Sequence, residues 1–336
     1  MIRTAMVGKQ PEKGPYRIRG GQLITSSVPY LEYLTGDYHR AACDYTIALS
    51  IQRQVEAGID ILSEGECLRD DYWQYILNYM DGLEKIEDPS NLGSSQWKVF
   101  EKPSIKNSFL GTDWENAQQF STKPVKITIP GPLTLASYVD ILSLELTFET
   151  LAQKFSELIN SEIKDAVAKG CKNIQIDDPQ LAIQTERAKE FGIELMGACF
   201  KGVPDNINKF LHVCRGYPDA ETFVECGNKA SEDCYLEIMP LLDKSPVNII
   251  SIENAFHPNS DQLFKMVENK ILMLGVVNIK SNRVETPNEI KRSVEHVLNF
   301  IPKDRLILAP DCGCACAPGS FIMKMQNLVK AADFFR

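Results

Sequence analysis

The sequence predicts an α/β protein of the (β/α)8 barrel class. Eight short runs of apolar and β-branched residues occur along the 336 residues, and most are separated by stretches with helical periodicity. Strands that alternate with helices imply a parallel sheet, and eight of them in a chain of this length suit a closed barrel better than an open sheet. Periodicity alone leaves the open sheet as an alternative. The third observation is that polar side chains follow the ends of the apolar runs, where a barrel carries its active site.

The predicted strands are runs of five to nine residues rich in Val, Ile and Leu. They span 4–8, 60–66, 125–129, 173–177, 209–214, 247–253, 271–279 and 306–310. Between them, Leu151, Phe155 and Ile159 follow the 3.6-residue period of a helix over 151–168. Thr286, with Pro287 and Glu289 behind it, is typical of a helix start and predicts a helix over 290–300.

One stretch departs from this alternation. Residues 83–122 are polar, rich in Ser, Asn, Gly and Pro, and contain Trp97 and Trp114. Such a stretch is typical of an extra loop or hairpin rather than a barrel helix. We therefore expect a single catalytic domain over 1–336, with an insertion at about 83–122, after the second barrel unit.

Charge and composition exclude several classes of function. The net charge is −9, without a basic run, so neither nucleic acid nor an anionic membrane is an expected partner. The first residues lack a signal-peptide pattern, and no apolar run reaches the roughly 18 residues that span a bilayer. Ten cysteines, several of them in apolar surroundings, favour reduced thiols. We expect a cytoplasmic protein acting on small molecules, with a homodimer left open.

The segment that ends the fifth predicted strand carries two metal-capable side chains. His212 and Cys214 are two residues apart, so they project from the same face of a strand. Cys312 follows the last predicted strand, and Glu253 ends the sixth. An imidazole and two thiolates from distant strands are a typical zinc ligand set, which a carboxylate can complete. A lone His-x-Cys is more often structural, and Glu253 is as easily an ion-paired carboxylate.

Further cysteines and carboxylates leave alternatives open. Cys314 and Cys316 can share a metal with Cys312 or form a redox pair, although a zinc site needs only one of the three. Asp177 and its neighbour Asp178 point to opposite faces of a strand, so one is expected to meet substrate while the other makes a structural contact.

Glu66 ends the second predicted strand. It can bind a substrate ammonium group, or it can hold its loop through Arg69. Its place at a strand end favours the substrate role.

These strand-end motifs together resemble the catalytic barrel of the cobalamin-independent methionine synthase family, and the resemblance runs from Thr4 to the end of the chain. The motifs that carry it occur in the same order and at strand ends. They are Glu64-Gly65-Glu66, Pro124-Val125-Lys126 leading into Pro130-Gly131-Pro132, Ile174-Gln175-Ile176-Asp177-Asp178-Pro179, His212-Val213-Cys214, Ser251-Ile252-Glu253 and Pro310-Asp311-Cys312-Gly313. The His-x-Cys-Arg-Gly form is most similar to the single-barrel short homologues.

The resemblance implies Zn2+ as the cofactor, bound by His212, Cys214, Glu253 and Cys312. It implies that Asp177 and Glu66 hold the amino group of homocysteine and serve as the catalytic pair. Ser251 is expected at the substrate. The family's first strand commonly ends Gly-Ser, whereas this chain has Gly8-Lys9, so Lys9 is expected to meet the substrate carboxylate from a longer arm.

The predicted function is therefore methyl transfer to a thiol, with methionine made from homocysteine. By resemblance, the methyl donor is a corrinoid or a methyl-folate, and Tyr72, Trp73 and the insertion are expected to cover it. Two alternatives remain: zinc-dependent alkyl transfer to another thiol such as coenzyme M, and a zinc-binding barrel without catalytic activity. A porphyrinogen decarboxylase shares the barrel but needs no metal, so the His-x-Cys motif argues against it.

Overall fold

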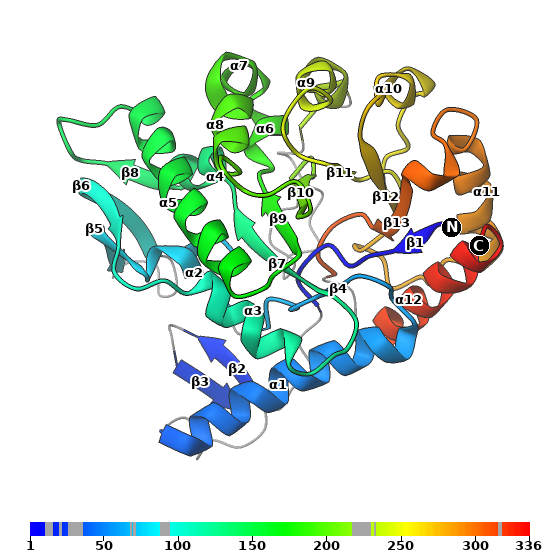
Figure 1. Ribbon diagram of the computed structural model, residues 1–336, viewed down its shortest axis with the longest axis horizontal. Helices are drawn as coiled ribbons and strands as arrows, with labels where there is room; N and C mark the ends of the chain where they lie inside the picture. The colour runs from blue at the N-terminus through cyan, green and yellow to red at the C-terminus, as the bar shows by residue number, and fades with distance from the viewer. Residues whose placement is uncertain are drawn as a thin grey trace.

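The computed structural model describes residues 1–10, 16–19, 22–25, 36–67, 69, 72–87, 95–216, 230–231, 233–314 and 318–336. Its centre is a sheet of eight parallel strands (Figure 1). In sheet order these are β1 (Arg3–Thr4), β13 (Leu306–Pro310), β12 (Ile271–Val277), β11 (Ile249–Ile252), β10 (Asn208–Val213), β9 (Asn173–Asp177), β7 (Val125–Pro130) and β4 (Leu62–Ser63).

The two end strands of this sheet are joined, which closes the barrel. Ala5 and Ile61 form a parallel bridge, in which Met6 N–H donates to the Ile61 carbonyl and Ile61 N–H donates to the Thr4 carbonyl. Sheet order then follows chain order around the ring, as right-handed β-helix-β units dictate. The predicted (β/α)8 fold class is confirmed, and the open sheet is not what the chain forms.

Helices surround the strands and bury the outward-facing side chains. The helices that follow successive barrel strands are α1 (Gly36–Ala57), α3 (Leu110–Gln118), α5 (Phe148–Ala168), α8 (Ile193–Ala198), α9 (Cys234–Leu242), α10 (Asp261–Lys265), α11 (Pro287–Val297) and α12 (Pro318–Asp333). The shorter ones are α2 (Gln74–Leu77), α4 (Pro132–Ser137), α6 (Gln180–Ile183), α7 (Thr185–Arg187), the π-turn η1 (Ala188–Gly192) and the 3-10 turn η2 (Lys303–Arg305).

The helix start predicted at Thr286 is confirmed, because Thr286 and Glu289 form a capping box at the beginning of α11. No helix in the described part of the chain combines the length and apolarity that crossing a membrane requires.

An antiparallel hairpin, β5 (Met80–Glu87) and β6 (Ser95–Ile105), follows the second barrel strand. A short strand, β8 (Val139–Ile141), adds to it in parallel from the next barrel loop. The stretch expected as an insertion also contains α3, which packs against α1 and α5 as a barrel helix does. The extra segment therefore lies between β4 and the helix of the second unit. A second hairpin, β2 (Tyr16–Arg19) with β3 (Gln22–Thr25), lies in the first barrel loop.

The barrel interior changes from apolar to polar toward the carboxyl ends of its strands. Phe210, Ile249 and Met273 belong to a compact inner core, separate from the large core between strands and helices. Since side chains two apart on a strand share a face, the next inward positions on the neighbouring strands are polar. They are Lys126, Thr128, Gln175, Asp177, His212 and Ser251, all of them buried. A buried polar layer at this end of the barrel needs a functional explanation.

Candidate metal and substrate site

His212, Cys214 and Cys312 meet above the inner core of the barrel. Their ligand atoms all lie within 4.8 Å of one another, and His212 and Cys214 are buried. Two sulfurs bound to one tetrahedral ion at about 2.3 Å each lie within roughly 5 Å of each other. The three segments are therefore close enough to hold a single cation.

The hydrogen bonding of His212 fits a metal ligand. Its Nδ1 lies 2.9 Å from the Ser251 hydroxyl, whereas its Nε2 is buried with no hydrogen-bond partner among the described residues. When Nδ1–H donates to Ser251, the lone pair of the neutral imidazole is on Nε2, which is the arrangement of a metal-bound histidine. A buried ring nitrogen without a partner is otherwise costly. The structure thus places Ser251 against the imidazole.

The two thiols of this group are in contact. A hydrogen bond donated by Cys312 lowers the pKa of Cys214 well below its usual value, with help from the neighbouring His212, and this outweighs the effect of burial. The same hydrogen bond and burial raise the pKa of Cys312 well above its usual value. The hydrogen bond between the two sulfurs therefore shifts their pKa values in opposite directions and favours the thiolate form at Cys214.

Glu253 follows β11 and lies outside the group of three metal-capable residues just described. It is fully buried, its Oε1 is 3.8 Å from Nη1 of Arg215, and it does not belong to the group within 4.8 Å. The Asn259 side-chain amide donates to the Glu253 carbonyl and Arg215 donates to Asn259, which ties together the loops that follow β10 and β11. The carboxylate is near the cluster and is also a member of an ion pair.

Asp311, next to Cys312, organises the loop that follows Glu253. Its Oδ1 accepts the N–H groups of Asn254 (2.9 Å) and Ala255 (2.8 Å), and its Oδ2 accepts that of Phe256 (2.7 Å). One carboxylate therefore fixes the positions of Cys312 and Glu253 relative to each other.

We expect Asp311→Asn to weaken zinc binding by about 10- to 100-fold, because one of its two acceptor oxygens becomes an amide that cannot accept an N–H. Chelator competition on the purified protein measures this. Asp243→Asn is the matched control, since Asp243 accepts the Asn269 N–H at the opposite end of the barrel. Equal zinc affinity in the two variants would contradict the role given to Asp311.

Asp177 faces the barrel interior beside His212, its register partner on β10. The side-chain amide of Gln175 donates to it at 2.6 Å, and burial raises its pKa to about 7. The adjacent Asp178 points away and accepts the N–H and hydroxyl of Thr134, so it caps α4. As expected from the sequence, Asp177 faces the barrel interior while Asp178 makes a structural contact.

Lys126 is fully buried in the barrel interior, where the charges of Asp177, Glu64 and Glu66 act on it. Its Nζ donates to the carbonyls of Met6 (2.6 Å) and Val7 (2.9 Å) and to the side-chain oxygen of Gln175. Burial lowers its pKa to about 7, but three acceptors match the three N–H groups of an ammonium, so we assign the charged form. Lys126 thus fixes the end of the first strand and supplies a cation below Asp177.

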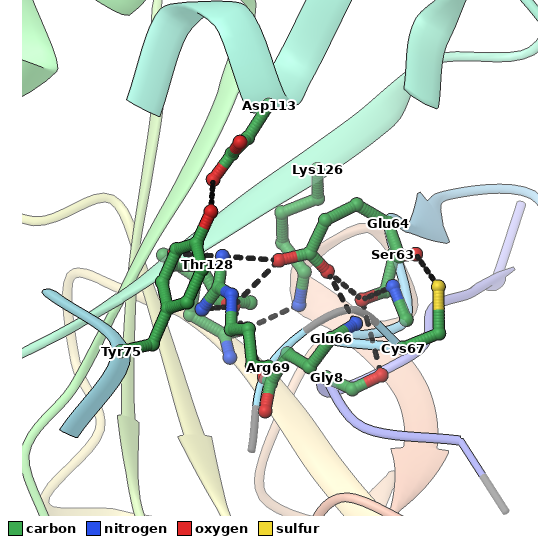
Figure 2. A network of polar contacts seen from close by, with 12 residues as sticks. Gly8, Ser63, Glu64, Glu66, Cys67, Arg69, Tyr75, Asp113, Lys126 and Thr128 are labelled. Atoms are coloured by element: carbon green, nitrogen blue, oxygen red, sulfur yellow. Dashed lines mark hydrogen bonds and ion pairs between the residues drawn. The ribbon is translucent and has the colours of Figure 1, made fainter. Parts of the chain in front are cut away.

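A second polar network surrounds Glu66 (Figure 2). Arg69 pairs with Glu64 at 2.5 Å, and it also donates to the hydroxyl and the carbonyl of Thr128. The Thr128 hydroxyl in turn lies 3.0 Å from Oε1 of Glu66. The guanidinium therefore binds Glu64 directly and reaches Glu66 through Thr128.

The backbone at Glu66 is unusual. Its φ is +52°, a left-handed conformation that non-glycine residues rarely adopt. The Glu66 N–H donates to Oε2 of Glu64, which holds this conformation. Gly8 leaves room for the side chain, because a Cβ at that position would lie 2.3 Å from Oε1 of Glu66. Strain of this kind is typical of functional sites.

Lys9, the residue after Gly8, joins the first loop to the last one. Its carbonyl accepts the N–H of Cys314 at 2.7 Å, and a Cβ on Gly313 would lie 3.0 Å from the Lys9 Cβ. The positive charge of Lys9 acts on Glu66, where it opposes the increase in pKa that burial causes. Lys9 is thus near both the metal-capable loop and the Glu66 network. Cys316 lies outside the described residues.

Aromatic side chains lie beside the mouth of the barrel. Trp73 stacks on Tyr138 with ring centroids 4.8 Å apart, and the Tyr138 ring is partly exposed. The Gln180 amide, which follows the Asp177 strand, donates to the Tyr138 hydroxyl at 3.4 Å. A flat aromatic surface of this kind suits a planar ligand ring.

Comparison with known proteins agrees with this geometry. The family model described as the catalytic domain of cobalamin-independent synthase matches residues 4–333. The chain belongs to the cobalamin-independent synthase family. The expected resemblance is therefore confirmed, and the protein is a methionine synthase-like methyltransferase.

Relatives of this synthase domain span most of the chain. The methionine synthase of Sulfurisphaera tokodaii is 30% identical over 83% of this chain and 78% of its own length. The methionine synthase of Sulfolobus acidocaldarius is 28% identical over 84% of this chain and 78% of its own length. Among solved structures, a B12-independent methionine synthase from Shewanella sp. W3-18-1, in complex with selenomethionine, has a TM-score of 0.85 at 23% identity, covering 100% of this chain and 98% of that one. A putative B12-independent methionine synthase from Listeria monocytogenes has a TM-score of 0.73 at 19% identity, and the match covers 100% of this chain and 99% of that one.

The sequence did not predict a role for several residues of the polar site described above. The sequence indicates Asp311 and Lys126 only as members of family motifs, and it assigns no role to Thr128. A usable signal exists for Lys126 and Thr128: both occupy alternate positions of a strand whose other positions are apolar, so they face the barrel interior. For Asp311 the partners are backbone groups of a distant loop, and sequence carries no signal for these.

Proposed function

We propose that this protein is a zinc-dependent methyltransferase that methylates the thiol of homocysteine to give methionine. The observation that carries the proposal is the buried Nε2 of His212, without a hydrogen-bond partner in the described part of the chain, beside the contacting thiols of Cys214 and Cys312. An imidazole nitrogen and two thiolate sulfurs are ligands that zinc prefers.

Glu253 is the proposed fourth ligand, since it is fully buried directly after the adjacent strand β11 and close enough to Cys214 to affect its pKa. Zinc bound by this set supplies Lewis acidity that keeps a substrate thiol deprotonated at neutral pH. Arg215 beside Glu253, and Ser251 behind His212, hold the two side chains in orientation.

The amino end of the substrate is proposed to lie between Glu66 and Asp177. Both carboxylates are buried, and burial raises the pKa of each above its usual value. A bound ammonium would offset their desolvation, and a charge-assisted hydrogen bond to each would fix the amino acid. Lys9 is proposed to meet the substrate carboxylate, as its position beside Glu66 allows.

Methyl transfer then depends on how the substrate thiol and the methyl donor are positioned relative to each other. With the amino group held at one point and the sulfur at another, the thiol chain has little freedom left, which lowers the entropic cost of the reaction. The Trp73 and Tyr138 stack is proposed to bear the methyl donor, whose transferred carbon must line up with the sulfur. The Shewanella structure with selenomethionine, an analogue of methionine, supports an amino-acid product.

A donor-by-thiol activity matrix on metal-analysed protein tests the proposal. We expect methionine from homocysteine with methylcobalamin or with methyl-folate, and no methylation of coenzyme M, whose sulfonate would meet two buried carboxylates without an amine. Methylation of coenzyme M in preference to homocysteine would overturn the substrate assignment. A zinc-replete protein inactive with every pair would support the non-catalytic alternative.

A further inference from the structure

Glu66, the carboxylate proposed above to bind the substrate ammonium, receives one side-chain hydrogen bond from the described residues. The donor is the Thr128 hydroxyl, with 3.0 Å between Oγ1 and Oε1. Thr128 is fully buried on β7, and its hydroxyl contacts both Arg69 and Glu66 (Figure 2). The orientation of the Glu66 carboxylate therefore depends on a single hydroxyl group.

The direction of that hydroxyl is set by Arg69. Arg69 Nη1 donates to the Thr128 oxygen at 3.1 Å, so the one hydroxyl hydrogen must point elsewhere. Two carboxylate oxygens are within reach: Oε1 of Glu66, and Oε1 of Glu64 at 3.2 Å. The Glu64 oxygen already accepts the guanidinium Nη2, so the Glu66 oxygen is the better acceptor.

The arrangement keeps the charge of Glu66 available. Arg69 makes its ion pair with Glu64, and its link to Glu66 runs through a neutral hydroxyl. The Glu66 carboxylate is thereby oriented by Arg69 without a direct ion pair to that guanidinium. A buried carboxylate in this state favours a cation from outside the protein.

We propose that Thr128 is a positioning residue for recognition of the substrate amino group, acting through the chain Arg69 to Thr128 to Glu66. This inference rests on the proposed function and adds a specificity-determining residue to it. Thr128 does not touch the thiol, and its loss should affect amino-bearing thiols alone.

The test uses Thr128→Val, which keeps the β-branched shape and removes the hydroxyl. Two thiols are compared: homocysteine, and 4-mercaptobutanoate, which is homocysteine without its amino group. We expect Thr128→Val to raise KM for homocysteine by about 10- to 100-fold, the effect of one hydrogen bond to a charged group. KM for 4-mercaptobutanoate, kcat and zinc content should stay within about twofold of the wild type.

Controls separate orientation from damage to the fold. Thr128→Ser retains the hydroxyl and should restore most of the wild-type KM. Ser245→Ala removes a buried hydroxyl that donates to the Leu242 carbonyl after α9, at the opposite end of the barrel from Glu66, and should change neither KM. Thr128→Ala provides a second variant without the hydroxyl should the Val variant not fold.

The outcomes are distinct. A KM that rises for homocysteine alone, and recovers in Thr128→Ser, supports the inference. Equal changes for the two thiols, or no change for either, overturn it while leaving the proposed function intact. A wild-type protein that uses both thiols equally well shows that no amino group is recognised, which contradicts the proposed substrate and the inference with it.

Discussion

Replacing Cys214 with Ser is expected to remove both zinc and activity. A serine hydroxyl is a poor zinc ligand at neutral pH, because it remains protonated, whereas the Cys214 thiolate is already favoured by the hydrogen bond from Cys312. We expect bound zinc to fall well below one per chain and turnover to fall by on the order of 1000-fold or more. Zinc content by elemental analysis and the rate of methionine formation measure the two effects.

Cys199→Ala is the matched control for that substitution. Cys199 is a free, fully buried cysteine in the outer layer of the barrel, where burial raises its pKa to about 12. Its loss should lower stability modestly and leave zinc content unchanged. A Cys214→Ser protein with full zinc and full activity would show that Cys214 is not a zinc ligand.

The second large effect is expected at the two carboxylates that face the proposed ammonium. Glu66→Gln and Asp177→Asn each retain the size of the side chain and remove its charge. We expect each to lower kcat/KM for homocysteine by about 100-fold, since a buried charge partner contributes on the order of 2–5 kcal/mol. Zinc content should remain near one per chain.

Steady-state kinetics with homocysteine and 4-mercaptobutanoate measure this effect. The thiol without an amino group should be insensitive to both substitutions, because it presents no cation to the carboxylates. Asp178→Asn is the comparison for Asp177→Asn: it alters the cap of α4 and should affect stability more than KM. Equal losses for both thiols would argue that Glu66 and Asp177 maintain the fold rather than bind the amino group.

The barrel itself could be predicted because its signals are local. Each strand is a short apolar run with turn residues behind it, and a helix such as 151–168 repeats its apolar residues with a period of 3.6. The pairing of His212 with Cys214 is local too, since strand geometry places them on one face. Cys312 could be added because all carboxyl ends of a parallel barrel meet at one face.

The features that the sequence does not predict depend on contacts between segments that are distant in the chain. The hairpin β5–β6 gains β8 from another loop, and no local pattern in residues 139–141 signals that pairing. The sequence allows Arg69 to pair with Glu66, whereas in the structure Arg69 pairs with Glu64, two residues earlier. The difference arises from the left-handed turn at Glu66, which redirects the side chain, and sequence reasoning gives no backbone angle for a glutamate.

Zinc-edge X-ray absorption spectroscopy on the purified protein tests the central claim most directly, that three remote segments share one cation. We expect one zinc per chain with two sulfur neighbours at about 2.3 Å and nitrogen or oxygen neighbours at about 2.0–2.1 Å, and a single sulfur neighbour for any zinc left in Cys312→Ser. A protein that binds no stoichiometric zinc, or zinc without sulfur neighbours, would contradict the claim.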